Sequence, residues 1–167
     1  MTVEINTSPN ISPLRFNSLT FAAALTAATA ATAAATLGWP VWAMFVGWVA
    51  FFTRAHSAKD ALYSYLCLAS GLGIGMIAAA SVGTLLPLIG PAAFGIVVFA
   101  VAMLVVSLRA VAPMNNIPAY FLGLITWFAA HAKPTPMAWL GLAAVAALGI
   151  FAAWIAHSWQ ATIMRRA

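Results

Sequence analysis

The sequence FVGWVAFF at residues 45–52 returns in altered form as FLGLITWF at residues 121–128. Both stretches fit the pattern F-x-G-x-x-x-[FW]-F, in which a glycine is followed by an aromatic pair one helical turn later. A proline lies shortly upstream of each stretch, at Pro40 and Pro118, and a histidine lies shortly downstream. The match predicts two related halves in one chain. The alternative is a chance match in a sequence rich in Phe, Gly and Ala.

Each of these stretches lies in a short apolar segment, at residues 39–52 and 117–130. A helix of about 14 residues is about 21 Å long, whereas the hydrocarbon core of a bilayer is about 30 Å thick. We therefore expect these two segments to form short or broken helices. Longer apolar segments complete the set and predict ordinary membrane-spanning helices at residues 19–37, 61–82, 91–108 and 137–160.

The composition excludes a soluble fold. Hydrophobic residues make up 65% of the 167-residue chain and charged residues 5%, and the mean hydropathy is +1.02. A soluble protein of this length cannot bury that much apolar surface. We expect an all-α membrane protein with one transmembrane helical domain over residues 17–160, a polar cytoplasmic tail over residues 1–16 and a basic cytoplasmic tail over residues 161–167.

The distribution of positive charge predicts the orientation. The net charge is +5, but Lys and Arg flank the apolar segments without forming a cluster, so they indicate topology and not nucleic-acid binding. If all six segments cross and the amino terminus is cytoplasmic, only Lys133 lies outside. If the two short segments dip in and return, Arg54, Lys59, Arg109 and Lys133 all lie outside. The positive-inside rule favours six crossings with both termini cytoplasmic.

Three crossings per half would invert the second half relative to the first, because three is an odd number. The expected fold is therefore six transmembrane segments arranged as two inverted three-helix repeats, with the second and fifth segments short or broken. Such repeats recur in channels and transporters, where the solute site lies near the midplane between the halves. The candidate solute path combines aromatic, small and polar residues in or just before the short segments: Phe45, Gly47, Trp48, Phe51, Asn115, Asn116, Tyr120, Phe121, Gly123 and Thr126.

Small residues in the third segment predict close helix packing. They recur every four residues as Cys67, Gly71, Gly75, Ala79 and Gly83, and they form a ridge that lets a neighbouring backbone approach. The first segment carries a stripe of threonines. Their hydroxyls can bond to carbonyls of their own helix or to a partner helix, so we expect Thr26, Thr29, Thr32 and Thr36 to form a buried helix contact. The alternative is the wall of a pore.

The chain is poor in groups that catalyse reactions. Glu4 and Asp60 are its only carboxylates and both lie outside the spans, so we expect no enzyme activity, no metal site and no cofactor. The lack of ionisable groups within the spans favours a passive path over a coupled pump. For His56, His131 and His157 we expect interfacial or capping roles. The matched placement of His56 and His131 also raises the hypothesis of a pH-dependent gate.

The segment from Pro40 to Phe52, taken with NIPAYFLG at residues 116–123, resembles the YcdZ-like family of small bacterial inner-membrane proteins, a domain of unknown function. The resemblance extends from about Phe21 to Trp159. It implies a location in the bacterial inner membrane. No established activity and no functional residues come with it.

Two functions remain open at this point. The first is a channel or facilitator for a small neutral or weakly polar solute, formed in the lipid bilayer by a homo-oligomer of the chain. The second is a non-transporting subunit that assembles with another membrane protein. A polar path between the two short segments would favour transport, whereas a solid core with a large groove facing lipid would favour assembly. A membrane-embedded enzyme is disfavoured because catalytic groups are lacking.

Overall fold

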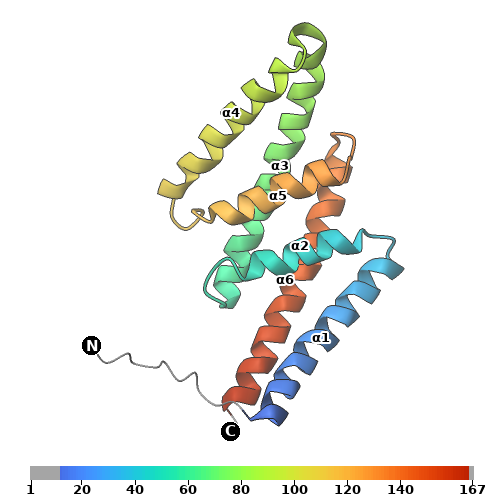
Figure 1. Cartoon of the computed structure of the whole chain (residues 1–167), viewed down its shortest axis with the longest axis vertical. Helices are drawn as coiled ribbons and strands as arrows, with labels where there is room; N and C mark the ends of the chain where they lie inside the picture. Colours follow the sequence, from blue (N-terminus) through green and yellow to red (C-terminus); the bar gives the residue numbers. More distant parts are fainter. Residues whose placement is uncertain (1–11, 166–167) are drawn as a thin grey trace, which may run out of the picture.

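A computed structural model describes residues 12–165, and this part of the chain is helical apart from its connections (Figure 1). The tail predicted over residues 1–16 lies mostly outside the described range, as do the last two residues of the tail predicted over residues 161–167. The elements are α1 (Pro13–Thr36), α2 (Val41–Phe51), α3 (Ala58–Ile89), α4 (Ala92–Ser107), the 3-10 turn η1 (Leu108–Ala110), α5 (Ile117–Ala129) and α6 (Pro136–Arg165).

The helix boundaries follow from local capping chemistry. α1 begins at Pro13, before the expected apolar segment, because proline at the first helical position lacks only an N–H that would have no partner there. The Ser12 hydroxyl accepts a hydrogen bond from the Arg15 N–H at 3.4 Å, and Ser57 caps α3 in the same way. α3 ends at Ile89 and is followed by Gly90, whose φ of 59° suits a residue without a Cβ atom.

The two short segments predicted from the sequence are confirmed. α2 has 11 residues and α5 has 13, which correspond to lengths of about 16 and 20 Å. Both are shorter than the hydrocarbon core of about 30 Å. In the described part of the chain, four stretches are long and apolar enough to cross a membrane: α1, α3, α4 with η1, and α6. These helices support the assignment of the chain as a membrane protein.

The long helices α3 and α6 form the centre of the molecule. They contact each other and run in opposite directions, α3 in the upper half of Figure 1 and α6 in the lower half. The short helix α5 lies across α3, and the short helix α2 lies across α6. Each short helix therefore packs on a long helix from the other half of the chain. The outer helices follow the same division, with α4 beside α3 and α1 beside α6.

Glycines let the two backbones touch where α2 crosses α6. A Cβ atom added to Gly47 would overlap the carbonyl oxygen of Ala146, and one added to Gly149 would overlap the carbonyl oxygen of Met44. Each helix thus contributes one glycine that meets a carbonyl of the other helix. This approach is closer than any residue with a side chain would allow.

The crossing of α5 over α3 has the same construction. Gly71 of α3 meets the carbonyl of Tyr120, and Gly123 of α5 meets the carbonyl of Leu68. Here too an added Cβ atom would overlap backbone, so the two helices are in direct main-chain contact. The ridge predicted on α3 lies on this side of the helix as far as Ala79, with Cys67, Gly71 and Gly75 buried and Ala79 partly buried. It does not extend to Gly83, which is exposed because no neighbouring backbone comes within 4 Å of its Cβ position.

The threonine stripe of α1 bonds to its own helix, and Thr29, Thr32 and Thr36 are exposed. Within the described chain it is therefore not the buried helix contact expected from the sequence. Its hydroxyls donate to carbonyls three or four residues earlier, and for Thr29, Thr32 and Thr36 the distance between the two oxygen atoms is 2.7 to 2.9 Å. Because the hydroxyl protons are used within α1, the stripe adds little polarity to the surface of this helix. The pairs are Thr26 with Ala22, Thr29 with Leu25, Thr32 with Ala28 and Thr36 with Ala33.

Replacing a crossing glycine by alanine should force the helices apart. We expect Gly71→Ala and Gly149→Ala each to lower the free energy of unfolding by about 1–3 kcal/mol, because the added methyl group must displace backbone and not a flexible side chain. Titration of the folded protein from mild detergent into SDS, followed by circular dichroism, measures this change.

Matched controls lie in the same two helices. Nothing lies within 4 Å of the Cβ positions of Gly83 in α3 and Gly141 in α6. Gly83→Ala and Gly141→Ala should therefore be neutral, or should stabilise by up to about 1 kcal/mol through helix propensity. Equal unfolding free energies for the crossing and control variants would contradict the direct backbone contacts.

Candidate functional site

Buried polar side chains are rare in residues 12–165, and two of them lie together. Ser64, Asn116 and Thr126 are the buried polar residues of the described part. The Asn116 side-chain amide donates to the Ser64 hydroxyl at 3.0 Å and to the Thr53 hydroxyl at 2.7 Å. We call Thr53, Arg54, Ser64, Asn115 and Asn116 the Asn116 cluster. It is the main concentration of interacting polar side chains in residues 12–165, and all its members except Ser64 lie in the connections next to α2 and α5.

Three elements bring this cluster together. Asn116 is the residue before α5, and its side chain makes no capping bond to that helix, so the amide is free to reach other elements. Thr53 follows the end of α2, where its hydroxyl also donates to the Ala50 carbonyl at 2.7 Å. Ser64 lies in the second turn of α3. The Asn116 amide, which is 4% exposed, thus joins the end of α2 and the start of α3 to the start of α5.

Arg54 and Asn115 form the outer part of the cluster. The Arg54 guanidinium donates a hydrogen bond to the Asn115 side-chain oxygen, and it lies 6.0 Å from the centre of the Tyr63 ring. This contact holds the α2–α3 connection against the α4–α5 connection. The cluster therefore presents one cation, two amides and two hydroxyls, a set that suits a neutral polar molecule or a small anion.

The polar groups do not continue into the bundle. Tyr120, one turn after Asn116, is 2% exposed and packs with Cys67 in the core. The Thr126 hydroxyl donates to the Leu122 carbonyl of its own helix at 2.8 Å. Gly123 lies against the backbone of α3. The interior between α3 and α5 is accordingly solid and largely apolar beyond the cluster.

The structure divides the residues of the predicted path between two separate places, α2 and the α5 region. Phe45 on α2 and Phe121 on α5 are 43% and 40% exposed and lie on the outside of the bundle. Trp48 is partly buried in the groove between α1, α2 and α6. Gly47 is covered by α6. Of the predicted path residues, Asn115, Asn116, Tyr120, Phe121, Gly123 and Thr126 belong to the α5 region, and Phe45, Gly47, Trp48 and Phe51 to α2.

Phe51 belongs to a separate cluster with two histidines. The rings of His56 and His157 are 4.7 Å apart, centre to centre, and the Phe51 ring lies 5.5 and 5.9 Å from them. His131 lies elsewhere, with its Nδ1 atom 2.9 Å from the Ala129 carbonyl oxygen. In the described part of the chain no third His, Cys, Asp or Glu joins the imidazole pair. His56 and His131, which occupy matched positions in the sequence, therefore do not lie together, and His56 instead lies beside His157.

Sequence reasoning missed three members of the Asn116 cluster. Arg54 was interpreted only as a topology signal, and Thr53 and Ser64 carried no motif. A polar residue at the edge of an apolar segment is normally a cap or a solvated residue, so nothing local distinguishes these two. Their partners are also remote, since Asn116 lies 63 and 52 residues away from Thr53 and Ser64.

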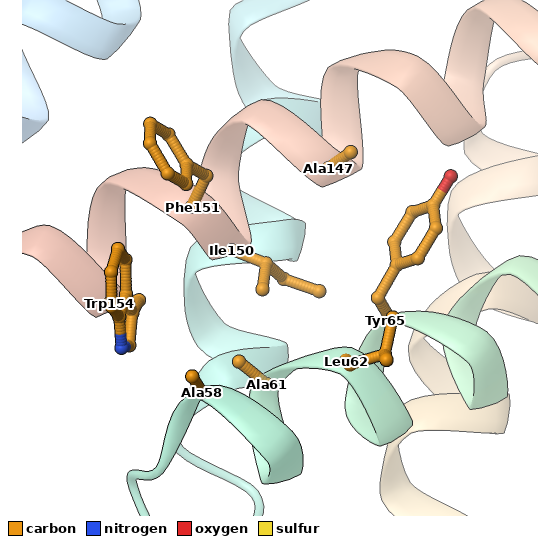
Figure 2. Close-up of a pocket in the computed structure, with 8 residues that line it drawn as sticks. All are labelled: Ala58, Ala61, Leu62, Tyr65, Ala147, Ile150, Phe151 and Trp154. Carbon is orange, nitrogen blue, oxygen red and sulfur yellow. The ribbon is translucent and has the colours of Figure 1, made fainter.

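The hollows between the helices are lined by apolar side chains. A groove of about 470 Å³ lies between α3, α4 and α5, and one of about 630 Å³ between α1, α2 and α6. A third, of about 330 Å³, lies between α3 and α6 (Figure 2). Of the residues lining these three grooves, only Thr20, Gln160 and Tyr65 carry a polar side-chain atom besides the indole nitrogens of Trp48 and Trp154.

Removing the amide from the cluster should destabilise the fold. We expect Asn116→Leu, which keeps the approximate volume, to lower the free energy of unfolding by about 1–3 kcal/mol, because the buried Ser64 hydroxyl loses its partner. Asn17→Leu, at an exposed position of α1, should change stability by less than about 0.5 kcal/mol. The same SDS titration compares them. A wild-type stability for Asn116→Leu would contradict a structural role of the amide.

Comparison with known proteins identifies the family. No curated protein and no solved structure matches the chain. A family model described as "Protein of unknown function (DUF1097)" matches residues 20–160. The matched range includes both short helices, all four glycines of the crossings and the Asn116 cluster. The chain therefore belongs to the DUF1097 family.

Proposed function

We propose that the chain is an inverted repeat and that it acts as a channel or facilitator for a small neutral or weakly polar solute. The observation that carries the repeat is the reciprocity of the helix crossings. In one crossing Gly47 of the short helix meets the Ala146 carbonyl of the long helix. In the other, Gly123 of the short helix meets the Leu68 carbonyl of the long helix. Exchanging the two halves of the chain would turn each of these contacts into the other.

The second pair of contacts obeys the same rule. Gly149 of α6 meets the Met44 carbonyl, and Gly71 of α3 meets the Tyr120 carbonyl. Met44 precedes Gly47 by as many residues as Tyr120 precedes Gly123. On the long helices, Gly149 follows Ala146 by as many residues as Gly71 follows Leu68. One constant shift in numbering therefore relates the short helices, and a second relates the long helices. The matching contacts in space support a repeat over a chance match of the F-x-G-x-x-x-[FW]-F pattern.

The larger architecture supports the same relation. Exchange of α1 with α4, α2 with α5 and α3 with α6 turns the groove between α1, α2 and α6 into the groove between α4, α5 and α3. Phe45 and Trp48 line the first groove, and the residues that the short-helix shift pairs with them, Phe121 and Leu124, line the second. In Figure 1 corresponding helices run in opposite directions, as an inverted repeat requires.

The proposed transport function follows from this architecture together with the Asn116 cluster. Inverted repeats with a short helix in matching positions recur in channels and transporters. The cluster offers amide and hydroxyl groups next to a short helix, and these suit a neutral polar solute. Because Asp60 and Glu4 are the only carboxylates, the proposal is passive conduction and not coupled transport.

The setting of the protein is part of the same proposal. We place the chain in a bacterial inner membrane, in keeping with its resemblance to the YcdZ-like family, with six crossings, both termini cytoplasmic, and assembly as a homo-oligomer. The hydrogen bond between Arg54 and Asn115 supports a common side for the α2–α3 and α4–α5 connections. Because the short helices lie across the long ones, the number of membrane crossings is the first point to test.

Cysteine labelling tests the topology. In a Cys67→Ala background, which removes the single natural thiol, we expect Ala55→Cys to react with an impermeant maleimide only from the cytoplasmic side and Ala132→Cys only from the opposite side. Six crossings put these two connections on opposite sides of the membrane. Labelling of both positions from one side would instead indicate that α2 and α5 dip in and return.

Stopped-flow light scattering on proteoliposomes tests conduction. We expect permeability to at least one of urea, glycerol, ammonia or formate to exceed that of empty liposomes by about tenfold or more, and Ser64→Ala and Thr53→Val to reduce it because they remove polar groups that meet the Asn116 amide. Ser107→Ala, which alters an exposed hydroxyl on α4, should conduct normally. Permeabilities equal to those of empty liposomes for the whole panel would contradict the channel.

A second candidate function is a non-transporting subunit of a larger membrane assembly. Two features that favour assembly over transport are present: the grooves between the helices are apolar, and the described part of the bundle has a solid core. The polar groups of the Asn116 cluster do not continue as a path between α2 and α5. Wide grooves of this kind suit helices of another membrane protein. This second function predicts that proteoliposomes are no more permeable than empty liposomes. It also predicts that the crossing glycines still contribute to the free energy of unfolding.

A further inference from the structure

The groove between α3 and α6 has aromatic ends and a small-residue floor. Figure 2 shows Tyr65 and Trp154 at its two ends, Ala58 and Ala61 on the α3 side, and Ile150 on the α6 side. Its volume is about 330 Å³, and none of its lining residues is charged. A neutral, largely apolar group is the chemistry that such a lining accepts.

The corresponding place in the other half is already filled by a tryptophan. The constant shift in numbering between the long helices, which pairs Gly71 with Gly149, also pairs Ala61 with Trp139. The Trp139 indole N–H donates to the carbonyl of Ala69 at 3.0 Å, and the same nitrogen lies 3.5 Å from the Cβ position of Gly73. In that half the indole ring of α6 therefore lies against α3 at residues 69–73.

The same shift gives the matching wall of the open groove. Ala69 and Gly73 of α3 correspond to Ala147 and Phe151 of α6, and both of these residues line the groove beside Ala61. The groove thus exists because an alanine stands where the other half has an indole. The Ala147 carbonyl, like that of Ala69, keeps a second lone pair for a donor in addition to its helical hydrogen bond.

We propose that this groove binds a free, neutral, flat aromatic molecule carrying one N–H group, of the size of indole. The inference rests on the internal repeat of the proposed function. The ring lies between Tyr65 and Trp154, where aromatic groups pack in offset or edge-to-face geometry, and its N–H donates to the Ala147 carbonyl as the Trp139 indole does to Ala69. The volume of about 330 Å³ is ample, since a cavity of about 150 Å³ already accepts benzene.

Equilibrium dialysis of radiolabelled indole against the full chain in detergent micelles tests the proposal. We expect saturable binding above the background of empty micelles. Ala61→Trp supplies the missing ring from α3, and Ala147→Leu narrows the groove from α6, so each variant should weaken binding by about tenfold or more. Ala80→Trp, at an exposed position of the same helix α3, is the matched control and should bind as the wild type does.

A third variant examines the equivalence of the two halves directly. Trp139→Ala should open the corresponding groove on the other side of the α3–α6 contact and add a second indole site of the same class. Added indole should also restore part of the thermal stability that this variant loses. A Trp139→Ala protein with no additional site would overturn the equivalence from which the ligand class is inferred.

The remaining outcomes separate this site from the proposed channel. Absence of saturable indole binding, or unchanged binding in folded Ala61→Trp and Ala147→Leu proteins, overturns the groove proposal even if urea or glycerol flux is normal. Saturable binding that those two variants weaken and Ala80→Trp retains supports it even if the liposomes conduct nothing. Circular dichroism of each variant verifies that a loss of binding is not a loss of fold.

Discussion

Direct contact between the backbones of crossing helices is the constraint on which the rest of this structure depends. At each crossing a glycine on the short helix and a glycine on the long helix face a carbonyl of the partner, at Gly47 and Gly149 in one case and Gly123 and Gly71 in the other. A lipid environment gives little hydrophobic drive for helices to associate, so close van der Waals contact must supply the attraction. Short helices bury few residues, and close approach increases the van der Waals contact that each of those residues makes.

This constraint explains why α2 and α5 are held by the opposite halves of the chain. Each short helix packs most extensively on the long helix that belongs to the other half, α2 on α6 and α5 on α3. Neither half can complete its own packing, because the partner of its short helix belongs to the other half. The two halves are thus interlocked, and the contact between α3 and α6 lies at the centre of the interlock (Figure 1).

The positions where the halves differ are more informative about function than the positions where they agree. The shared glycines and aromatic pairs build the scaffold. By contrast, Ser64 and Asn116 make a buried polar contact at the start of α5, whereas in the proposed repeat the long-helix residue that corresponds to Ser64 is Leu142. Ala61 likewise stands where the other half carries Trp139. In the proposed repeat, these two differences coincide with the proposed solute site and the proposed aromatic site.

Much of the fold follows from local properties of the chain. The total apolar content requires a membrane or an equivalent environment, and the lengths of the apolar segments distinguish α2 and α5 from the four long helices, since hydrophobic length is read directly from consecutive residues. The tertiary structure decided which residues pack against each other and which form hydrogen bonds. Spacing alone does not tell Gly71, which touches Tyr120, from Gly83, which touches nothing within 4 Å. Nor does it join Asn116 to Thr53 and Ser64, which are 63 and 52 residues away. Helix formation depends on neighbours in the chain, whereas close packing and buried hydrogen bonds depend on which surfaces meet in space.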